Sequence, residues 1–197
     1  MNQTTTVIKS ERKQQILTLA SDLLRTRGFE GFSYQDLSQE LGIRKASIHH
    51  HFAKKEDLGL ALCNWTKTWL EQGLNHFDKH GSSQWNKLER YIAAAKKHVL
   101  DEQKICPLSS LHGDMSLLPV SMVKAIKALD EIELNWVSRV LTEGLESGEF
   151  KFEGEARPLA AIFVFSSKGA LHYARLHDQT LLSGMMTQFE RWLRHAT

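Results

Sequence analysis

The sequence predicts an all-α fold of about nine helices. Almost every segment carries apolar residues three or four positions apart, the spacing that places them on one face of a helix. The alternation of apolar and polar residues that is typical of a half-buried strand is nearly absent. The 197 residues include only 3 prolines, so long uninterrupted helices are permitted.

The composition is that of an ordinary soluble globular protein, with 42% hydrophobic and 24% charged residues. The net charge is +2, and the whole excess lies before residue 58, where nine Lys and Arg accompany seven Asp and Glu. Together with three consecutive histidines, this is a weak electrostatic sign of nucleic-acid binding. Two cysteines exclude a secreted disulfide framework. Neither a signal core nor an apolar run of about 18 residues occurs, so we expect a cytoplasmic protein that does not bind a membrane.

The first three expected helices are close together in the sequence. The first covers residues 10–27, and its apolar stripe consists of Ile16, Leu19, Ala20, Leu23 and Leu24. The second opens where Ser33 and Asp36 approximate a capping box, and it ends at Gly42. The third covers residues 45–51. Two short helices joined by a tight turn that contains glycine are typical of the helix-turn-helix unit.

Longer helices are expected over the rest of the chain. Glu56 and Asp57 lie in the first turn of one of them, where the helix dipole favours negative charge. Pro119 stands at the first position of another, where a missing N–H costs nothing. The expected ranges are residues 55–77, 84–100, 106 to 113 or 115, 119–146, 155–176 and 180–195. The chain is therefore divided into a helix-turn-helix domain, residues 1–54, and a helical domain, residues 55–197.

Several motifs occur together at the helix-turn-helix unit. They are Gly28-Phe29 after the first helix, Leu37 and Leu41 in the second, Gly42-Ile43 in the turn, Ala46-Ser47-Ile48 and His49-His50-His51-Phe52 in the third, and Lys55-Glu56-Asp57-Leu58 after it. In this combination the segment resembles the TetR/AcrR family of transcriptional regulators. The resemblance is specific over roughly the first 60 residues, and beyond them it consists mostly of length and helix pattern.

The resemblance implies a DNA-binding domain followed by a helical domain with a ligand pocket, and a homodimer made by the last two helices. It implies a regulator, on family grounds a repressor, of a near-palindromic operator in double-stranded DNA. A small-molecule inducer, or an electrophile or oxidant, would release it. Two recognition helices about 34–36 Å apart would enter successive major grooves on one face of the duplex.

The third helix is suited to the major groove, because Ala46 and Ser47 are small enough to let its backbone approach the bases. Arg44 and Lys45 supply positive charge at its start. The residues expected to contact DNA are Ser33, Tyr34, Gln35, Arg44, Lys45, Ala46, Ser47, His49, His50, His51, Lys54 and Lys55. The alternative is a helical core segment whose basic residues form a solvated face.

Two of these residues depart from the family pattern. Arg44 stands where the family often has a capping Ser or Thr, so either the cap is lost or Arg44 contacts DNA. His49 replaces an aromatic residue, and histidine titrates near neutrality. The three adjacent histidines point in different directions on a helix, so we expect no metal site there, and no cofactor elsewhere.

The last two helices carry the residues expected to form the dimer. Residues 159–170 are apolar and rich in small residues, which allow helices to approach closely. The stripe of the final helix consists of Leu181, Leu182, Met185, Phe189 and Trp192. The alternative is that both are core helices of one subunit.

Candidates for a ligand pocket are large apolar residues and histidines from different helices. They are Trp65, Trp69, His98, His112, Met115, Met122, Trp136, Phe163 and His172. For each of them the alternative is an ordinary core position or, for a histidine, an exposed one.

Cys106 is a separate candidate sensor, because it stands at the expected start of a helix, where a thiolate is stabilised. The stretch resembles that of TetR-like repressors that sense oxidants or electrophiles. Modification of the thiolate would shift the dimer away from its DNA-binding shape, with Lys168 and Arg175 as candidate cationic neighbours. The alternative is an inert buried thiol.

Two other function classes are weaker. An enzyme is not expected, because the sequence has no phosphate loop, dinucleotide fingerprint, HExxH motif or nucleophile elbow. A helical interaction protein without DNA binding remains an alternative, and it predicts no salt-dependent affinity for DNA.

Overall fold

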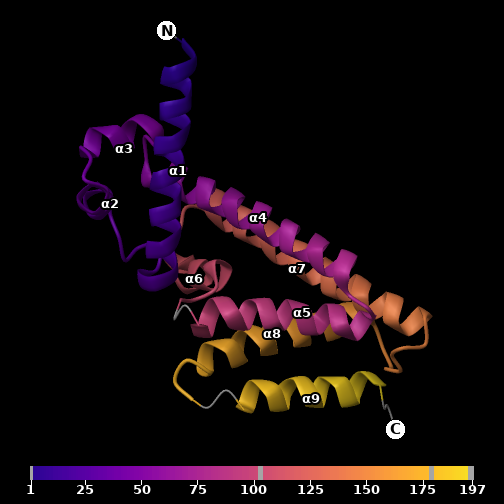
Figure 1. Cartoon of the computed structure of the whole chain (residues 1–197). Coiled ribbons are helices and arrows are strands. Elements are labelled where there is room, and N and C mark those ends of the chain that lie inside the picture. The colour runs from indigo at the N-terminus through magenta and orange to yellow at the C-terminus, as the bar shows by residue number, and fades with distance from the viewer. Residues whose placement is uncertain (1, 102–103, 178–179, 195–197) are drawn as a thin grey trace. The chain divides into compact units, whose positions relative to one another are not determined.

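The structure is a computed structural model that describes residues 2–101, 104–177 and 180–194. Within these ranges the chain forms nine α-helices and no strand, which confirms the predicted all-α class (Figure 1). The helices are α1 (Asn2–Arg27), α2 (Tyr34–Leu41), α3 (Lys45–His51), α4 (Lys55–His80), α5 (Gln84–Lys96), α6 (Pro107–Gly113), α7 (Val120–Glu146), α8 (Ala156–Tyr173) and α9 (Thr180–Arg194). A π-helical turn, η1 (Lys97–Asp101), and a 3-10 turn, η2 (Met115–Leu117), complete the set.

Helix boundaries differ from the expected ones at several ends. Helix α1 begins earlier than residue 10, and α4 continues to His80, because nothing breaks it before Gly81. The expected helix over residues 84–100 changes to π geometry after Lys96. Helix α8 ends at Tyr173 rather than 176, and His195, the expected end of the last helix, lies outside the described residues.

Packing divides the chain into two compact units. The first consists of residues 1–67 and 107–127, and the second of residues 68–106 and 128–197. Both α4 and α7 contribute residues to each unit. The predicted functional boundary between residues 54 and 55 coincides with the start of α4. The packing units do not test it, so it remains a prediction.

The core of the first unit holds the short helices in place. Ile16, Leu24, Leu37, Ile48 and Leu58 are all completely buried there. Helix α6 is tied to α1, because Ser110 Oγ donates a hydrogen bond to the carbonyl of Leu24 at 2.5 Å. Helix α6 therefore supports the end of α1 that leads into α2.

A carboxylate fixes the turn between α1 and α2. Asp114 Oδ2 accepts hydrogen bonds from the backbone N–H groups of Phe29 at 2.6 Å and Glu30 at 3.3 Å. Gly28 adopts a φ of 81° there, and an added Cβ would come within 3.0 Å of Asp114 Oδ2. The left-handed backbone and the nearby carboxylate both favour glycine at this position.

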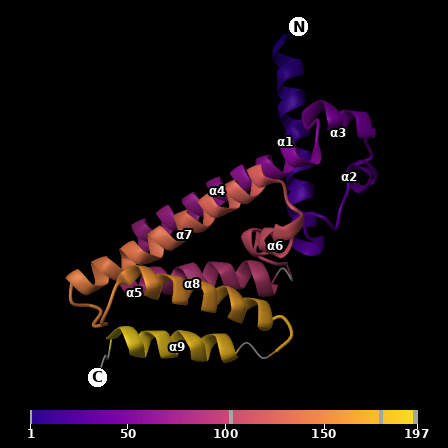
Figure 2. The ribbon, with the colours of Figure 1, turned by 180° about the vertical axis from the view of Figure 1, so that it is seen from behind.

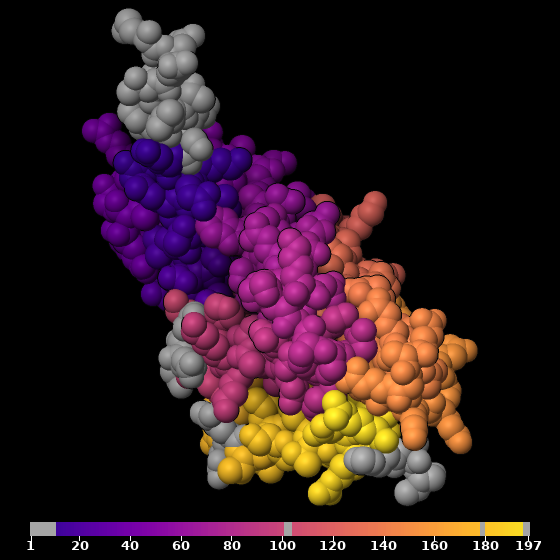
Figure 3. Space-filling model, turned by 45° about the vertical axis from the view of Figure 1, so that its right-hand side comes forward, coloured from indigo at the N-terminus to yellow at the C-terminus, as the bar shows by residue number. Residues whose placement is uncertain are grey.

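The second unit is built from α5, α8, α9 and the adjoining parts of α4 and α7. Helices α8 and α9 pack side by side in both ribbon views (Figures 1 and 2). In the space-filling view their side chains form one continuous surface (Figure 3). Aromatic residues fill the core, where the ring centroids of Phe163 and Phe189 lie 5.1 Å apart.

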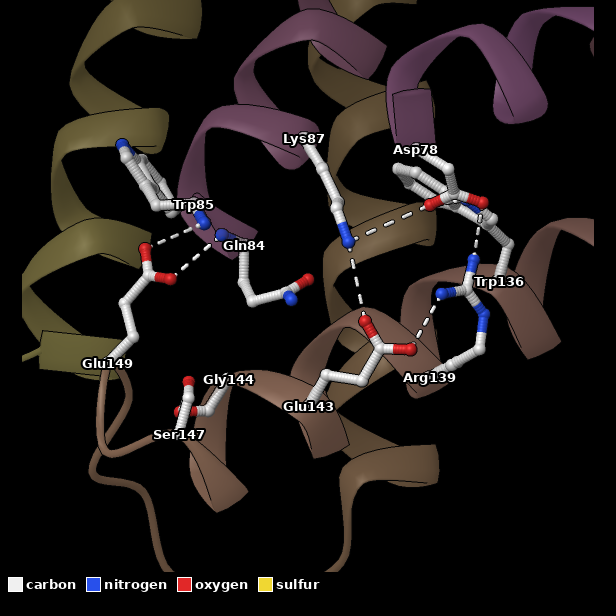
Figure 4. Close-up of polar contacts among 10 residues, drawn as sticks. All are labelled: Asp78, Gln84, Trp85, Lys87, Trp136, Arg139, Glu143, Gly144, Ser147 and Glu149. Carbon is white, nitrogen blue, oxygen red and sulfur yellow. Dashed lines mark hydrogen bonds and ion pairs between the residues drawn. The ribbon is translucent and has the colours of Figure 1, made fainter. Parts of the chain in front are cut away.

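A charged network joins α4, α5 and α7 in the second unit (Figure 4). Arg139 binds Asp78 at 2.6 Å and Glu143 at 2.8 Å, and Lys87 lies 3.3 Å from Glu143. Asp78 also accepts a hydrogen bond from Trp136 Nε1 at 3.1 Å. The network therefore holds the buried indole of Trp136 in a single orientation.

None of the helices within the described ranges has an apolar stretch long enough to span a bilayer.

Candidate nucleic-acid interface

Helix α2 is fixed at both ends by its own sequence. The predicted capping box is present, since Ser33 Oγ accepts from the backbone of Asp36 and Asp36 Oδ2 accepts from the backbone of Ser33 at 2.7 Å. Hydrogen bonds from the Ser33 side chain and backbone lower the pKa of Asp36. Gly42 closes the helix with a φ of 61°, in the left-handed region.

Tyr34 lies inside the unit rather than on its surface. It is buried, and its hydroxyl lies 2.9 Å from the carbonyl of Phe52 and 2.6 Å from that of Lys54. Burial, and then the charge of Asp57, raise its pKa to about 12, so the hydroxyl keeps its proton as a donor. The expectation that Tyr34 contacts DNA is therefore corrected: Tyr34 ties the start of α2 to the junction of α3 and α4.

Helix α3 begins without a side-chain cap. Arg44 occupies the N-cap position and makes no capping hydrogen bond, as expected for a residue without a side-chain oxygen. Ile48 is completely buried and Phe52 nearly so, which orients the helix. Arg44 and Lys45 are exposed, and the described part of the chain provides no ion-pair partner for either. The N-terminal end of α3 is therefore an uncompensated cationic surface.

The three histidines differ in their surroundings. The His49 ring packs edge-on against Tyr34 at 4.9 Å, and its Nδ1 lies 3.2 Å from the carbonyl oxygen of Ala53. The rings of His50 and His51 are 5.4 Å apart; His50 is exposed and His51 half-buried. His49 and His50 are thus both exposed, and His51 is the least accessible of the three.

The two lysines at the start of α4, Lys54 and Lys55, also differ in their surroundings. Lys54 is exposed, and its backbone N–H donates to Asp57 Oδ2 at 2.8 Å. The Lys55 ammonium instead lies 3.4 Å from Glu30 and 4.8 Å from the centre of the Phe29 ring. Lys55 is therefore engaged within its own unit in this structure, and its expected role as a phosphate clamp stays a prediction.

The remaining expected DNA contacts have exposed or half-buried side chains, and they lie at the start of α2, on α3 or in the residues next to α3. Exposed members are Ser33, Gln35, Arg44, Lys45, Ala46, His49, His50 and Lys54, and the half-buried ones are Ser47 and His51. No sequence pattern indicated Asp114, which positions the turn before α2 from 85 residues further along the chain. No local pattern marks such a distant partner.

The expected ligand residues are divided between the two units, and their role stays a prediction. Trp136 and Phe163 lie in the core of the second unit, where Tyr91 contacts both rings. Trp69, 40% exposed, contacts His98 at 5.3 Å. Met122 is completely buried in the first unit, where a Cβ on Gly59 would meet its sulfur. The others are half-buried or exposed, and they are Trp65, His112, Met115 and His172.

Cys106 and its expected neighbour Lys168 both belong to the second unit. Cys106 is half-buried and packs against the core of the second unit. Lys168, one of its expected neighbours, has its Nζ 2.6 Å from Glu133 Oε2, and Tyr91 donates to Glu133 Oε1 at 2.6 Å. Arg175, the other expected neighbour, is exposed.

Metal-binding side chains do not gather anywhere in the described ranges: no three His, Cys, Asp or Glu residues are placed to hold one ion.

Comparisons with known proteins identify the family. Residues 16–62 match the family described as bacterial regulatory proteins, tetR family. The fold is similar to a TetR-family regulator from Agrobacterium tumefaciens, with a TM-score of 0.89 and 30% identity, covering 94% of this chain and 99% of that one. It is also similar to a TetR regulator from Legionella pneumophila, with a TM-score of 0.81 and 29% identity, covering 92% and 96%.

In sequence, the chain is 21% identical over 174 residues to the uncharacterised HTH-type transcriptional regulator YfiR of Bacillus subtilis, covering 87% of this chain and 83% of YfiR. These relatives are regulators rather than enzymes. With the helix-turn-helix geometry of α2 and α3, they establish that the chain belongs to the TetR family of DNA-binding transcriptional regulators.

Proposed function

We propose that this protein is a dimeric repressor whose two α3 helices enter successive major grooves of a near-palindromic operator. The observation that carries the proposal is the start of α3, where Arg44 and Lys45 are exposed without an ion-pair partner in the described part of the chain. Unpaired cations at a helix N-terminus are suited to phosphate oxygens, and the small Ala46 lets the backbone approach the bases.

The contacts that we propose differ in kind. Lys45 and Lys54 bind phosphate, and Arg44 binds either phosphate or a base edge at the groove. His50 and Gln35 provide hydrogen-bonding groups at the two flanks of the same surface. Tyr34 and Lys55 act from inside the unit by holding this surface in place.

A second copy of the chain completes the proposed repressor by packing against α8 and α9. Ile162 and Phe165 on α8, and Leu181 and Trp192 on α9, are 52%, 61%, 66% and 53% exposed. Their spacing follows the helical repeat, so each helix presents an apolar stripe that its own subunit leaves uncovered. A Cβ on Gly184 would meet nothing within 4 Å, which leaves room for a close approach by a partner helix. A two-fold four-helix bundle fits these features.

The DNA-binding proposal is tested by measuring fluorescence anisotropy on a duplex selected from a random pool. Replacing Lys45 with Ala is expected to weaken binding several-fold and to reduce the slope of log affinity against log salt by about one. Lys151→Ala, which removes the same charge from an exposed site in the second unit, is the matched control and is expected to change neither quantity. Unchanged affinity in Lys45→Ala would contradict the assignment of α3 as the reading helix.

The inducer is proposed to act on the second unit, with Cys106 as the responsive group. Its thiol is half-buried and packs against the core of the second unit, in the residue directly before α6. Cys63 is unsuited to this role, because burial raises the pKa of its thiol to about 11.

The sensing proposal is tested by adding N-ethylmaleimide to the operator complex. Release of the wild type, and retention of Cys106→Ser on the duplex, is the expected result. Release of both proteins, or of neither, would remove Cys106 from the mechanism and leave a reversibly bound small molecule as the inducer.

A further inference from the structure

The His49 side chain is held where α3 ends and α4 begins. Its Nδ1 lies 3.2 Å from the carbonyl oxygen of Ala53, and its ring packs edge-on against Tyr34, with the ring centroids 4.9 Å apart. The Tyr34 hydroxyl lies 2.9 Å and 2.6 Å from the two neighbouring carbonyls, those of Phe52 and Lys54. These two side chains therefore reach three consecutive backbone carbonyls, and the imidazole is fixed in place beside the reading helix.

The contact with Ala53 determines which ring nitrogen carries the proton. A carbonyl oxygen only accepts hydrogen bonds, so Nδ1 must be the donor, and in the neutral ring Nε2 is then an acceptor without a proton. His49 is exposed, and the described part of the chain offers its Nε2 no hydrogen-bond partner. A neutral His49 can donate from Nε2 only if it gives up the bond to Ala53, whereas an imidazolium donates from both nitrogens at once.

The position of His49 favours a phosphate over a base edge as its partner in DNA. His49 is the fifth of the seven residues of α3, and base edges are read mainly by the first residues of a recognition helix. Lys54, which is proposed above to bind phosphate, directly follows the Ala53 that His49 contacts. A phosphate oxygen is an acceptor, so it would be repelled by a bare Nε2 and bound by a protonated one.

The charged and titratable groups around His49 come from all the elements that pack around the α3–α4 junction. They are Lys13 of α1, whose ammonium lies 5.6 Å from the centre of the Phe52 ring, Tyr34 of α2, Lys45 and His50 of α3, and Lys54 and Asp57 beside the start of α4. Burial, and then Asp57, raise the pKa of Tyr34 to about 12, so its hydroxyl is neutral. The carboxylates of α2 and of the turn before it are bound elsewhere, Asp36 to Ser33, Glu40 to Arg27 and Glu30 to Lys55. Negative charge in excess of these lysines therefore has to come from DNA.

We propose that His49 binds an operator phosphate as an imidazolium, with Nε2 donating to a phosphate oxygen while Nδ1 stays bonded to Ala53. The negative phosphate favours the protonated ring, so each α3 takes up as much as one proton from solvent when it binds DNA. Operator affinity then rises as the pH falls through the range in which histidine titrates. The inference rests on the proposed function, in which α3 is the reading helix.

The test measures operator affinity by fluorescence anisotropy between about pH 6 and pH 8.5 at constant ionic strength. His49→Asn is the informative variant, because an Asn amide nitrogen can replace Nδ1 as the donor to Ala53 but does not take up a proton. Wild type and variant should bind similarly at pH 8.5, and the wild type about tenfold more tightly at pH 6. His76→Asn removes an exposed imidazole from the second unit and should show the wild-type pH profile.

The salt dependence separates a charged contact from a structural role. Each additional phosphate neutralised adds about 0.9 to the slope of log affinity against log salt, so two His49 contacts in a dimer add about two. The increase in this slope from pH 8.5 to pH 6 should therefore be smaller by about two in His49→Asn. A side chain that only supports the fold would change the affinity equally at every pH and leave this increase as it is in the wild type.

Modified duplexes identify the DNA group with the wild-type protein, so this measurement stands even if the variant does not fold. A methylphosphonate removes the charge of one phosphate, and at one position in each half-site it should abolish the His49 part of the pH dependence. Replacing guanines with 7-deazaguanine, which lacks the N7 acceptor, should leave that dependence intact. The reverse pattern would mean that the ring binds a base edge, and it would overturn the phosphate contact.

A full wild-type pH dependence in His49→Asn would also overturn the proposal. In that case a weaker affinity of Lys45→Ala would still support α3 as the reading helix. Unchanged affinity of Lys45→Ala at every pH would instead contradict the proposed function itself, so the two failures are distinguishable.

Discussion

The two compact units of the chain use their interior polar side chains in different ways. In the first unit such side chains bind backbone groups: Tyr34 reaches the carbonyls of Phe52 and Lys54, and Asp114 reaches the N–H of Phe29. In the second unit the buried carboxylate of Glu133 binds the ammonium of Lys168. One unit therefore fixes the path of its chain, while the other contains an ion pair between two helices.

This difference corresponds to the two tasks of a ligand-responsive regulator. A reading helix must be held rigidly, and bonds from side chain to backbone hold it without depending on the rotamer of a second side chain. A responsive element needs two arrangements of similar free energy, and a buried ion pair with spare donors can provide them. The apolar surface differs as well, since the second unit leaves stripes on α8 and α9 uncovered.

The largest expected effect comes from placing a charge on these stripes. Phe165→Glu puts a carboxylate where a partner subunit is proposed to pack, so the dimer should dissociate. Loss of two-site binding should lower operator affinity by at least about a hundredfold. Sedimentation velocity and anisotropy check the two results.

Leu145→Glu is the matched control for Phe165→Glu. Leu145 is 42% exposed near the end of α7 and is not part of the stripes on α8 and α9. We therefore expect neither the dimer nor the operator affinity to change. If Phe165→Glu remains dimeric and binds the operator normally, α8 is not the dimer surface.

An intermediate effect is expected where Asp114 holds the turn after α1. Asp114→Ala leaves the Phe29 N–H without its acceptor, which should reduce the free energy of unfolding by about 1–3 kcal/mol. Operator affinity should fall as well, because the turn leads directly into α2. Asp114→Asn keeps an acceptor oxygen and should recover part of both losses. Urea unfolding at a fixed protein concentration measures the stability. Equal stability of Asp114→Ala and wild type would contradict the idea that this contact fixes the first unit.

Local sequence signals were enough to predict most of the fold. The capping box of Ser33 and Asp36, the left-handed Gly42 and the uncapped Arg44 all follow from residues within one turn of one another. The change to π geometry at Lys97–Asp101 was not predicted, because apolar spacing over five residues does not separate the two kinds of helix.

The site was predicted less completely, for reasons that depend on distance along the chain. Tyr34 and Lys55 are polar residues beside the reading helix, and the sequence alone does not indicate whether they face solvent or the core. Lys55 pairs with Glu30 and Phe29, which lie 25 or more positions earlier in the chain. The contact of Asp114 with Phe29, like that of Lys168 with Glu133, forms only when the helices pack.

The smallest expected effect concerns Glu149, which caps α5 in the second unit. Its carboxylate accepts from the backbone N–H groups of Gln84 at 2.8 Å and Trp85 at 3.0 Å, and Arg194 lies 3.3 Å away (Figure 4 shows the two backbone contacts). Burial opposes the ionised form, but these hydrogen bonds outweigh it and lower the pKa of Glu149 below 4.5. The stability it contributes is therefore present at neutral pH and is lost as the pH falls through the folded-state pKa.

Glu149→Gln should accordingly destabilise the protein by about 1 kcal/mol at pH 7, since a neutral amide is a weaker acceptor. The difference from the wild type should shrink as the pH falls below 4.5, where the wild-type carboxyl also becomes neutral. Urea midpoints at pH 7 and pH 3.5 measure it, with the exposed Glu153→Gln as the control that should show no difference at either pH. A gap that stays constant with pH would mean that the shape of the side chain, rather than its charge, holds the start of α5. Glu149 would then resemble Tyr34 of the first unit, whose neutral hydroxyl holds the backbone, and the contrast between the two units would be confined to the ion pair of Lys168 and Glu133.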